Sequence, residues 1–419
     1  MKRILRNLGI GLAVSIGSAA MAQSTVTFWH IYDSGDALDF INEVVNDFNT
    51  ENPDVIVNHL GTNFWDYWTR LTTAMAAGTG PDVSLNDLGN VASRAAMGVI
   101  APLDEFMAAD GVGIDEYWEA THPMLQFEGS TYALPLETDV RALYYNKAHF
   151  AEVGLDPESP PANWAELSEY TDLLTNQLDN GRLTRVGFNP TWGNLGIYTL
   201  AWLNGAELLD ADGNLVLNSP EMIETLEFMV DLQTRYGERE VSSFSASFGS
   251  GATDPFMTGQ VSMIAENNTF AAQIRRFAPD LDFGVAALPN NDSPASWSNG
   301  FSIEIASSST NKEAAWRFMS YLMSDEVQAA YAARNGSMVG NQAAATAPEL
   351  MEDEVWAVMV EQMGIAQFRP FIMEAPTWYD TALQPEVDAA LLGRKSAQQA
   401  LDDAQASLEA EVQRYLDTQ

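Results

Sequence analysis

Alternation between strand-like and helix-like segments near the start of the chain is the strongest constraint on its fold. The segment STVTFWHI (residues 24–31) is rich in β-branched and aromatic residues, which is typical of a buried strand. The apolar residues that follow have helical spacing up to Asn52-Pro53, which ends the predicted helix: Ala37, Ile41, Val44 and Phe48. VIVNHL (55–60) and the end of GTGPDVSLND (78–87) predict two further strands around a second helix. Strands separated by helices form parallel sheets, so we expect an α/β fold.

Further helix starts are marked along the rest of the chain. Asn163, Thr310 and Ser396 each precede a Glu or Gln by three residues, which is the spacing of a capping box. Ser219-Pro220 places proline at the first position of another predicted helix. The sequence contains no internal repeat and no long linker. We therefore expect domains that share crossover connections rather than domains joined by flexible tethers.

The N-terminal segment has the features of a secretory signal peptide. Three basic residues precede a short apolar run from Leu8 to Ile16, and Ala20-Met21-Ala22 has the small-x-small pattern of a cleavage site. A membrane anchor is the alternative, but the apolar run is too short to span a bilayer. No cysteine is available for lipid attachment. We expect residues 1–22 to be removed on export to the periplasm.

The charge balance limits the possible partners. The chain has 58 Asp and Glu against 20 Lys and Arg, a formal net charge of −38. Such a field repels nucleic acid and anionic membranes, so we expect no nucleic-acid partner. Screening by salt would relieve the repulsion, which favours a marine or halophilic origin. A calcium load is the alternative, but no DxDxDG loop is present, and the absence of cysteine rules out disulfides and thiolate metal sites.

Sequence signatures of enzymes are mostly missing. The four histidines are isolated, and the chain has no HExxH, GxSxG or GxxxxGK[ST] motif. Glu137 and Asp139 could form the carboxylate pair of a glycosidase, although neighbouring acids carry little information in so acidic a chain. We expect no catalysis, no cofactor and no metal ion.

Aromatic residues beside small polar ones are the positive signal for a binding site. Five tryptophans adjoin Asn, Asp, Gly or similar polar residues: Trp29, Trp65, Trp192, Trp297 and Trp378. Flat rings cover the apolar faces of sugars while polar side chains take up the hydroxyl groups. Packing in the core is the alternative for each ring.

The segment NFWDYW (63–68) contains both kinds of aromatic. Phe64 and Trp68 share helical spacing with Leu71 and Met75, so we expect them in the core. Trp65 lies about 100° round the helix, in its first turn. Ligands bind beyond the carboxyl ends of parallel strands, which makes Asn63 and Trp65 site candidates and leaves Tyr67 open.

Eight motifs in register resemble a known family. They are VTFWH…FNTENPDV, YWTRLTTAMAAGTGPDV, YALPLETDVRALYYNKAHF, PPANWAEL, FMTGQVSMI, LDFGVAALP, NGFSIEIASSSTNKEAAWRFMSYLMSDEVQ and GRKSAQQALDDAQ. Together they resemble the carbohydrate-type extracellular solute-binding proteins of ABC importers, such as the maltose-binding and glycerol-3-phosphate-binding proteins. The resemblance extends over nearly all of residues 25 to 416.

The resemblance implies two α/β lobes, each a mainly parallel sheet flanked by helices, joined by a hinge of several crossovers. It places the crossovers near Pro135–Asp139, Val285–Pro289 and Arg334–Val339. The lobes would then be residues 23–138 plus 286–333, and residues 139–285 plus 334–419. The chain departs from the family's pattern after FMTGQVSM, where ENNTF leaves the contact open between Asn267 and Phe270, and after AARNG, which makes the third crossover approximate.

Candidate ligand contacts follow from the family's contact positions together with the exposed-ring argument. They are Tyr32, Asp33, Asn63, Trp65, Asn86, Asp87, Asp139, Arg141, Trp192, Asn267, Trp297, Asn299, Gly300, Trp378 and Tyr379. Among these, Trp65 and Trp378 are expected to face the cleft from opposite lobes.

The expected function is that of a monomeric periplasmic protein that carries a neutral sugar, from mono- to oligosaccharide, to an inner-membrane ABC permease. Two alternatives remain. Arg141 and Arg369 leave room for an anionic sugar or polyol derivative, phosphorylated or sulfonated, and a secreted glycoside-acting enzyme is the second alternative.

Overall fold

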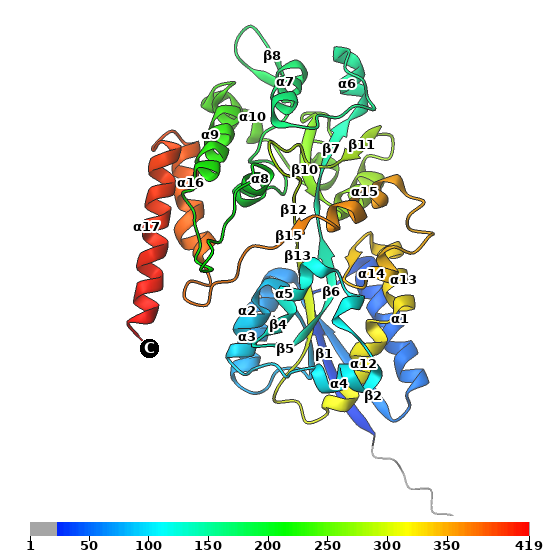
Figure 1. The fold of residues 1–419 in the computed structure, drawn as a ribbon. Helices are drawn as coiled ribbons and strands as arrows, with labels where there is room; N and C mark the ends of the chain where they lie inside the picture. Colours follow the sequence, from blue (N-terminus) through cyan, green and yellow to red (C-terminus); the bar gives the residue numbers. More distant parts are fainter. Residues whose placement is uncertain (1–22, 419) are drawn as a thin grey trace, which may run out of the picture.

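The computed structural model describes residues 23–418, which form two lobes joined by extended strands (Figure 1). The predicted signal peptide lies outside the described residues. The N-terminal lobe is built on a six-stranded sheet in the order β14-β6-β13-β3-β1-β2. Its strands are β1 Ser24–His30, β2 Val55–Gly61, β3 Val83–Asp87, β6 Ala133–Asp139, β13 Asn299–Ile305 and β14 Met338–Val339.

Helices cover both faces of this sheet (Figure 1). Helix α1 packs Phe40, Ile41 and Phe48 into the core beneath β1 and β2, which accounts for the helical spacing of its apolar residues. The helices of this lobe are α1 Gly35–Glu51, α2 Phe64–Ala76, α3 Val91–Ala96, α4 Asp104–Asp110, α5 His122–Leu125, α12 Lys312–Leu322, α13 Asp325–Asn335 and α14 Gln342–Ala345.

The C-terminal lobe surrounds a three-stranded sheet in the order β10-β7-β11. These strands are β7 Arg141–Asn146, β10 Met263–Asn267 and β11 Phe283–Ala286. Its helices are α6 Lys147–Val153, α7 Trp164–Leu174, α8 Ile197–Leu203, α9 Pro220–Thr234, α10 Glu238–Ser245, α11 Thr269–Phe277, α15 Glu354–Met363, α16 Gln384–Leu391 and α17 Ala397–Leu416. Three short ladders complete the strands: β4 Gln126–Phe127 with β5 Ser130–Thr131, β8 Asn176–Gln177 with β9 Leu183–Arg185, and β12 Ser296–Trp297 with β15 Ala366–Gln367.

The two-lobe α/β architecture agrees with the expectation, whereas the strand directions differ from it in part. β1 runs parallel to β2 and β3, as the alternation of strands and helices predicts. β13 runs antiparallel to both β3 and β6, and β7 is antiparallel to both of its neighbours. The expectation of two mainly parallel sheets is therefore wrong in detail. The antiparallel strands belong to segments that cross between lobes, where no helix returns the chain to the same edge of the sheet.

The crossovers define where each lobe begins. The first lies where β6 ends at Asp139 and β7 starts at Arg141. The second lies at the junction of β12 and β13, because residues up to Trp297 pack with the C-terminal lobe. β14 pairs with β6, so the boundary expected at residue 334 moves to the connection between α14 and α15.

Most of the predicted helix starts are confirmed by side-chain caps. Asn163 accepts a hydrogen bond from the Glu166 amide at 2.9 Å, and Ser396 accepts one from the Gln399 amide at 3.2 Å. Ser219 caps α9 with Pro220 in the first helical position. The cap expected at Thr310 is wrong, because Asn311 precedes α12 and makes no side-chain cap.

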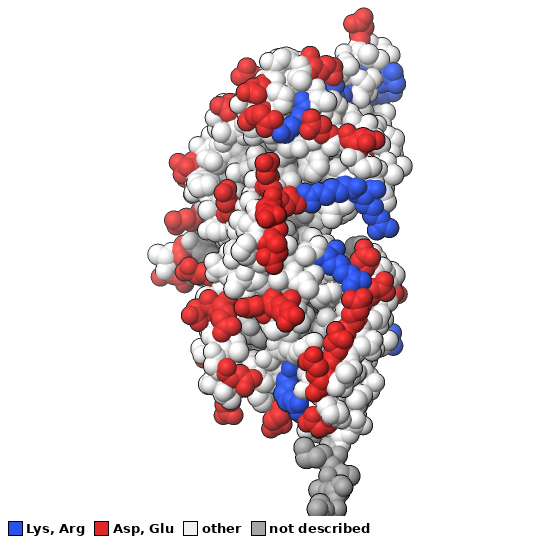
Figure 2. Space-filling view, turned by 90° about the vertical axis from the view of Figure 1, so that its right-hand side faces the viewer, with Lys and Arg blue, Asp and Glu red and all other residues white. Residues whose placement is uncertain are grey.

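Among the charged groups of the chain, carboxylates are in excess over basic groups. Figure 2 shows Asp and Glu spread over both lobes, with few Lys or Arg among them. Between residues 23 and 418, no helix is both long and apolar enough to cross a membrane. Within the same range, no group of three or more Asp, Glu or His side chains is placed to hold a metal ion.

Candidate functional site

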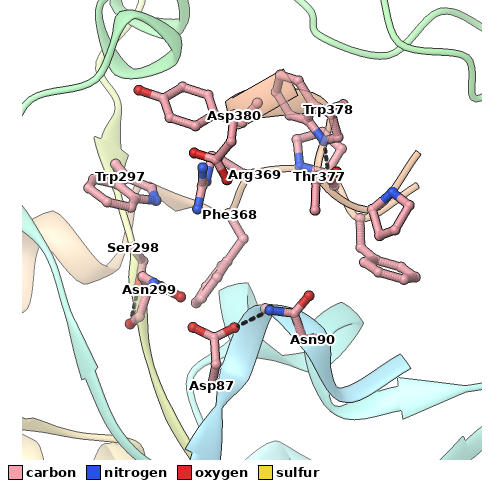
Figure 3. A pocket seen from close by; sticks show the side chains of 15 residues that line it. Asp87, Asn90, Trp297, Ser298, Asn299, Phe368, Arg369, Thr377, Trp378 and Asp380 are labelled. Carbon is pink, nitrogen blue, oxygen red and sulfur yellow. Dashed lines mark hydrogen bonds between the residues drawn. The ribbon is translucent and has the colours of Figure 1, made fainter. Parts of the chain in front are cut away.

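A cavity of about 180 Å³ lies where the two lobes face each other (Figure 3). Three polar residues form its wall on the N-terminal lobe. Asp87 ends β3, Asn90 lies on the turn after β3, and Asn299 begins β13. Asp87 accepts a hydrogen bond from the Asn90 amide nitrogen at 2.8 Å. This wall therefore presents carboxylate and amide groups at the carboxyl end of a parallel strand, where ligands bind in α/β folds.

The C-terminal wall is aromatic and carries one guanidinium group. The Arg369 guanidinium carbon lies 4.6 Å from the ring centre of Tyr379, 5.4 Å from that of Tyr198 and 5.8 Å from that of Trp297. Within residues 23–418 this side chain has no hydrogen-bond or ion-pair partner. Cation–π contacts hold its plane without using its N–H donors. Arg369 can therefore offer its donors to a ligand.

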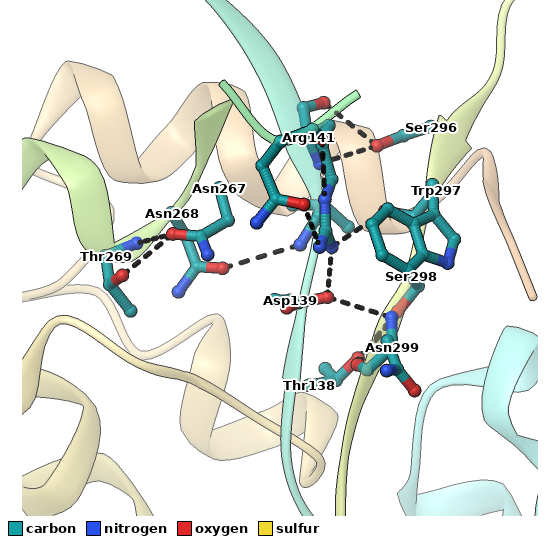
Figure 4. Close-up of polar contacts among 12 residues, drawn as sticks. Thr138, Asp139, Arg141, Asn267, Asn268, Thr269, Ser296, Trp297, Ser298 and Asn299 are labelled. Atoms are coloured by element: carbon teal, nitrogen blue, oxygen red, sulfur yellow. Dashed lines mark hydrogen bonds and ion pairs between the residues drawn. The ribbon is translucent and has the colours of Figure 1, made fainter. Parts of the chain in front are cut away.

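Arg141 lies behind this wall and braces it (Figure 4). Its side chain is buried, forms an ion pair with Asp139 and donates to Asn194 at 3.0 Å. Its guanidinium carbon lies 3.6 Å from the ring centre of Trp297. Arg141 is thus a buried link between the hinge and the cleft wall. The sequence predicts that Arg141 contacts the ligand, but its side chain is not open to one in this structure.

Asp139 is held from two sides. Besides its ion pair with Arg141, it accepts a hydrogen bond from the Asn299 amide at 2.8 Å. Gly300 follows Asn299 with φ of +147°, and a Cβ there would lie 2.2 Å from the Glu137 carbonyl oxygen. The role of Gly300 in the structure is therefore to allow close contact between β13 and β6.

Glu137 is buried in the hinge and does not face the cleft. Its carboxylate accepts hydrogen bonds from Tyr32 at 2.9 Å and from Tyr331 at 3.0 Å. Burial raises the pKa of Glu137 above its usual value. Because Glu137 is bonded to two tyrosines and Asp139 to Arg141, these carboxylates do not form the open pair that a glycosidase needs. Tyr32, an expected ligand contact, also has its hydroxyl engaged here.

The NFWDYW segment differs from its predicted orientation. Trp65 is 81% exposed, as expected of a ring outside the core, but Phe64 is 38% exposed, so the prediction that it belongs to the core is wrong. Trp68 is half-buried. Tyr67 is the buried ring, and its hydroxyl donates to the carbonyl oxygens of Trp29 and Leu85. The inward face of α2 is therefore set by Tyr67 and Leu71.

Trp378 lines the cavity but is only 3% exposed. Its indole N–H donates to the Pro370 carbonyl oxygen at 3.0 Å, which satisfies the one polar group of the ring. The expectation of a partly wet stacking ring is wrong for Trp378. Tyr379 and Trp297 are partly exposed rings of this wall, as are Phe368 and Phe371.

The other candidates lie outside this cavity. Asp33 and Asn63 are exposed, and Asn63 caps α2 by accepting from the Trp65 amide. Asn86 is buried and donates to Glu304 at 3.4 Å. Trp192 is half-buried against Phe244 and Phe248.

Burial distinguishes Asn267 from Phe270 as the possible ligand contact of the loop after β10. Phe270 is 3% exposed and packs against Tyr144 and Phe256 in the core. Asn267 accepts hydrogen bonds from Thr269, so its amide nitrogen stays available. Asn267 remains the candidate of this loop.

A family model decides the class of this protein. Residues 43–358 match the model of the bacterial extracellular solute-binding proteins. The chain belongs to this family. The solute-binding protein is 27% identical over 386 residues to a binding protein of Brucella abortus (strain 2308), which covers 88% of this chain and 89% of that one. It is 26% identical over 307 residues to the sn-glycerol-3-phosphate-binding periplasmic protein UgpB of Salmonella typhimurium, covering 68% of this chain and 66% of that one.

Solved structures share the two-lobe fold of the solute-binding protein. CpMnBP1 with mannotriose bound has a TM-score of 0.80 at 26% identity, covering 92% of this chain and 100% of that one. An ABC transporter solute-binding protein from Thermotoga lettingae TMO, bound with α-D-tagatose, has a TM-score of 0.77 at 26% identity, covering 93% and 100%. The family resemblance read from the sequence motifs is confirmed.

Several cavity residues of this solute-binding protein were not among the sequence candidates. Thr377 and Asp380 flank the predicted Trp378 and Tyr379, and Arg369 precedes them in the same C-terminal segment. The sequence indicates Arg369 only as a possible partner of an anionic ligand. Asn90 lies three residues after Asp87, on the turn that follows β3, and that proximity is the one signal that could have identified it.

Proposed function

We propose that this solute-binding protein captures a neutral mono- or oligosaccharide between its lobes and delivers it to an inner-membrane ABC permease. It acts as a periplasmic monomer after loss of residues 1–22 and catalyses no reaction. The observation that carries the proposal is the cavity between the lobes. There the aromatic surfaces of Trp297 and Tyr379 lie beside acceptors and donors from both lobes.

The charges around the cavity favour a neutral ligand. Arg369 is the one cation lining it, and the carboxylates of Asp87 and Asp380 line it as well. Asp accepts and Arg donates hydrogen bonds, so the set matches hydroxyl groups, which do both. A phosphate or sulfonate group would be attracted by Arg369 but repelled by the two carboxylates. CpMnBP1 and the Thermotoga lettingae protein, solved with mannotriose and α-D-tagatose, support the sugar class.

An anionic sugar or polyol derivative is the second candidate. The unpaired donors of Arg369 and the similarity to UgpB favour it. The secreted glycoside-acting enzyme has less support, because Glu137 and Asp139 are engaged within the hinge.

Isothermal titration with neutral sugars and with glycerol 3-phosphate tests the proposal. We expect a neutral mono- or oligosaccharide to bind and to remain chemically unchanged after long incubation. A ligand at about 100 times its dissociation constant adds roughly 2.7 kcal/mol of stability, so a thermal-shift screen can select the panel. Binding of glycerol 3-phosphate alone, or turnover of a glycoside, would overturn it.

A further inference from the structure

A second hollow opens from the cleft and runs along the N-terminal lobe between α2 and α3. We call it the α2–α3 groove. It has a volume of about 590 Å³. Residues of α2, of α3 and of the strands and turns beside them line it: Phe64, Trp68, Leu71, Thr72, Met75, Ala76, Asn86, Asp87, Asn90, Ser93, Arg94, Met97, Val99, Asn299 and Phe301. Asp87, Asn90 and Asn299 also line the cleft cavity, so the two spaces meet at these residues.

Large apolar side chains form the walls of the groove and are left facing water. Trp68 stacks on Phe301 with ring centres 6.0 Å apart, and Phe64 meets Trp68 edge-on at 5.5 Å. Phe64 is 38% exposed and Met97 is 65% exposed. Exposed apolar side chains gathered at one place mark a site that something else covers.

Most polar groups of the groove lie at its cleft end or are already paired. The Arg94 side chain forms an ion pair with Glu304 and donates to the Asp87 carbonyl oxygen at 2.6 Å. Beyond Asn90, the hydroxyls of Thr72 and Ser93 are the polar side-chain groups that line it. A second sugar ring placed there would bury hydroxyl groups without partners, which is unfavourable. An alkyl or aryl group would bury only apolar surface.

We propose that the α2–α3 groove binds the apolar aglycone of a glycoside whose sugar occupies the cleft. The inference rests on the proposed sugar site and narrows its substrate class to glycosides with an alkyl or aryl group. The shared residues Asp87, Asn90 and Asn299 mark the point where the glycosidic bond passes from the polar cleft to the apolar groove.

Matched methyl and octyl glycosides of glucose, mannose and maltose test the groove by isothermal titration. We expect the octyl compound to bind at least tenfold more tightly than its methyl partner, since each buried methylene is worth about fourfold in affinity. Thr72→Trp fills the groove from an exposed position and should abolish the gain. Thr73→Trp, exposed on the same helix and outside the groove, should keep it.

The uncharged dye N-phenyl-1-naphthylamine tests the groove without any sugar. Its fluorescence should rise with wild type and with Thr73→Trp, and not with Thr72→Trp. If no methyl glycoside binds, the dye still decides the groove, and the wider sugar titration decides the proposed function. Equal dye binding by both variants, no dye binding by wild type, or an octyl gain that persists in Thr72→Trp overturns the inference. If Thr72→Trp loses transport but keeps the octyl gain, the groove serves contact with the permease. That result also overturns the inference.

Discussion

At the residue scale, Arg369 lines the cavity with donors that no described residue engages. Arg369→Ala removes charged hydrogen bonds worth about 1.5–3 kcal/mol, so we expect sugar binding to weaken at least about tenfold. The stability of the ligand-free protein should fall only by the loss of the cation–π contacts to Tyr198, Trp297 and Tyr379, because no described residue forms a hydrogen bond or ion pair with this guanidinium. Arg276→Ala, an exposed arginine outside the cavity, is the matched control for titration calorimetry. Unchanged binding in Arg369→Ala would remove it from the site.

Trp378 and Trp65 are expected to respond in opposite ways to truncation. Trp378 belongs to the core of the C-terminal lobe, so Trp378→Ala should lower the free energy of unfolding by about 3–5 kcal/mol. Trp65 is 81% exposed, and Trp65→Ala should change that free energy by no more than about 0.5 kcal/mol. Because Trp65 is an expected sugar contact, Trp65→Ala should instead weaken sugar binding. Urea unfolding and sugar titration of both variants check the pair, and the reverse order of stabilities would contradict it.

Residue chemistry in this site was more predictable than side-chain orientation. Four of the expected ligand contacts also line the cavity: Asp87, Trp297, Asn299 and Tyr379. Helical spacing placed Phe64 on the inner face of α2, but periodicity cannot distinguish a face that meets the core from one that lines a groove. Nor could the sequence show that the Pro370 carbonyl oxygen would accept the Trp378 indole N–H and hold that ring in the core.

At the scale of elements, β1 and β2 are joined by a pair of neutral histidines. His30 and His59 are hydrogen-bonded at 2.9 Å, and His59 bonds to Asn42 at 3.1 Å. Burial, followed by the neighbouring His59, lowers the pKa of His30 to about 3. In the unfolded chain this histidine titrates near its ordinary value of 6.5. The unfolded state therefore binds more protons between these values, and the free energy of unfolding falls as pH falls from 6.5 towards 3.

His30→Gln should flatten that pH dependence. Between pH 6 and 4 one such group contributes up to about 1.4 kcal/mol per pH unit. Glu266, whose pKa burial raises to about 7, acts in the opposite direction as pH rises through the range from 4.5 to 7. The comparison is therefore between the slopes of wild type and variant in urea unfolding at several pH values. Equal slopes would mean that His30 is not the responsible group.

Elements with strong local signals were predicted, and the long-range pairings were not. The helix of residues 35–51 and the strands on either side follow from spacing and composition alone. The partners of β7, β13 and β14 depend on contacts between segments more than a hundred residues apart in several cases. Local sequence carries no record of such pairing. The expected third crossover failed for this reason, because β14 adds to the edge of the first sheet.

At the scale of the whole molecule, the cavity has one wall on each lobe, which implies closure on the ligand. The ligand contacts both walls only when the lobes approach, so binding shifts the population towards the closed form. Small-angle scattering should show a smaller radius of gyration with saturating sugar than without it. Arg369→Ala at the same sugar concentration should show a smaller decrease. Tight binding with an unchanged radius would argue against closure.

The acidic surface governs how the whole molecule responds to salt. The full chain has a formal net charge of −38, and carboxylates lie on both lobes, so the folded chain repels itself more than the expanded unfolded chain does. Raising sodium chloride from about 0.05 to 1 M shortens the screening length to roughly 3 Å, so the melting temperature should rise. Potassium chloride should act equally, because screening depends on ionic strength and not on a specific cation.

A calcium-dependent fold makes the opposite prediction. If carboxylates were held together by bound calcium, EDTA would lower the melting temperature and calcium alone would restore it at constant ionic strength. The carboxylates of residues 23–418 form no group of three placed to hold such an ion. We therefore expect EDTA to leave the melting temperature unchanged at every salt concentration. A large loss of stability in EDTA that sodium chloride does not reverse would show that the surface serves metal binding.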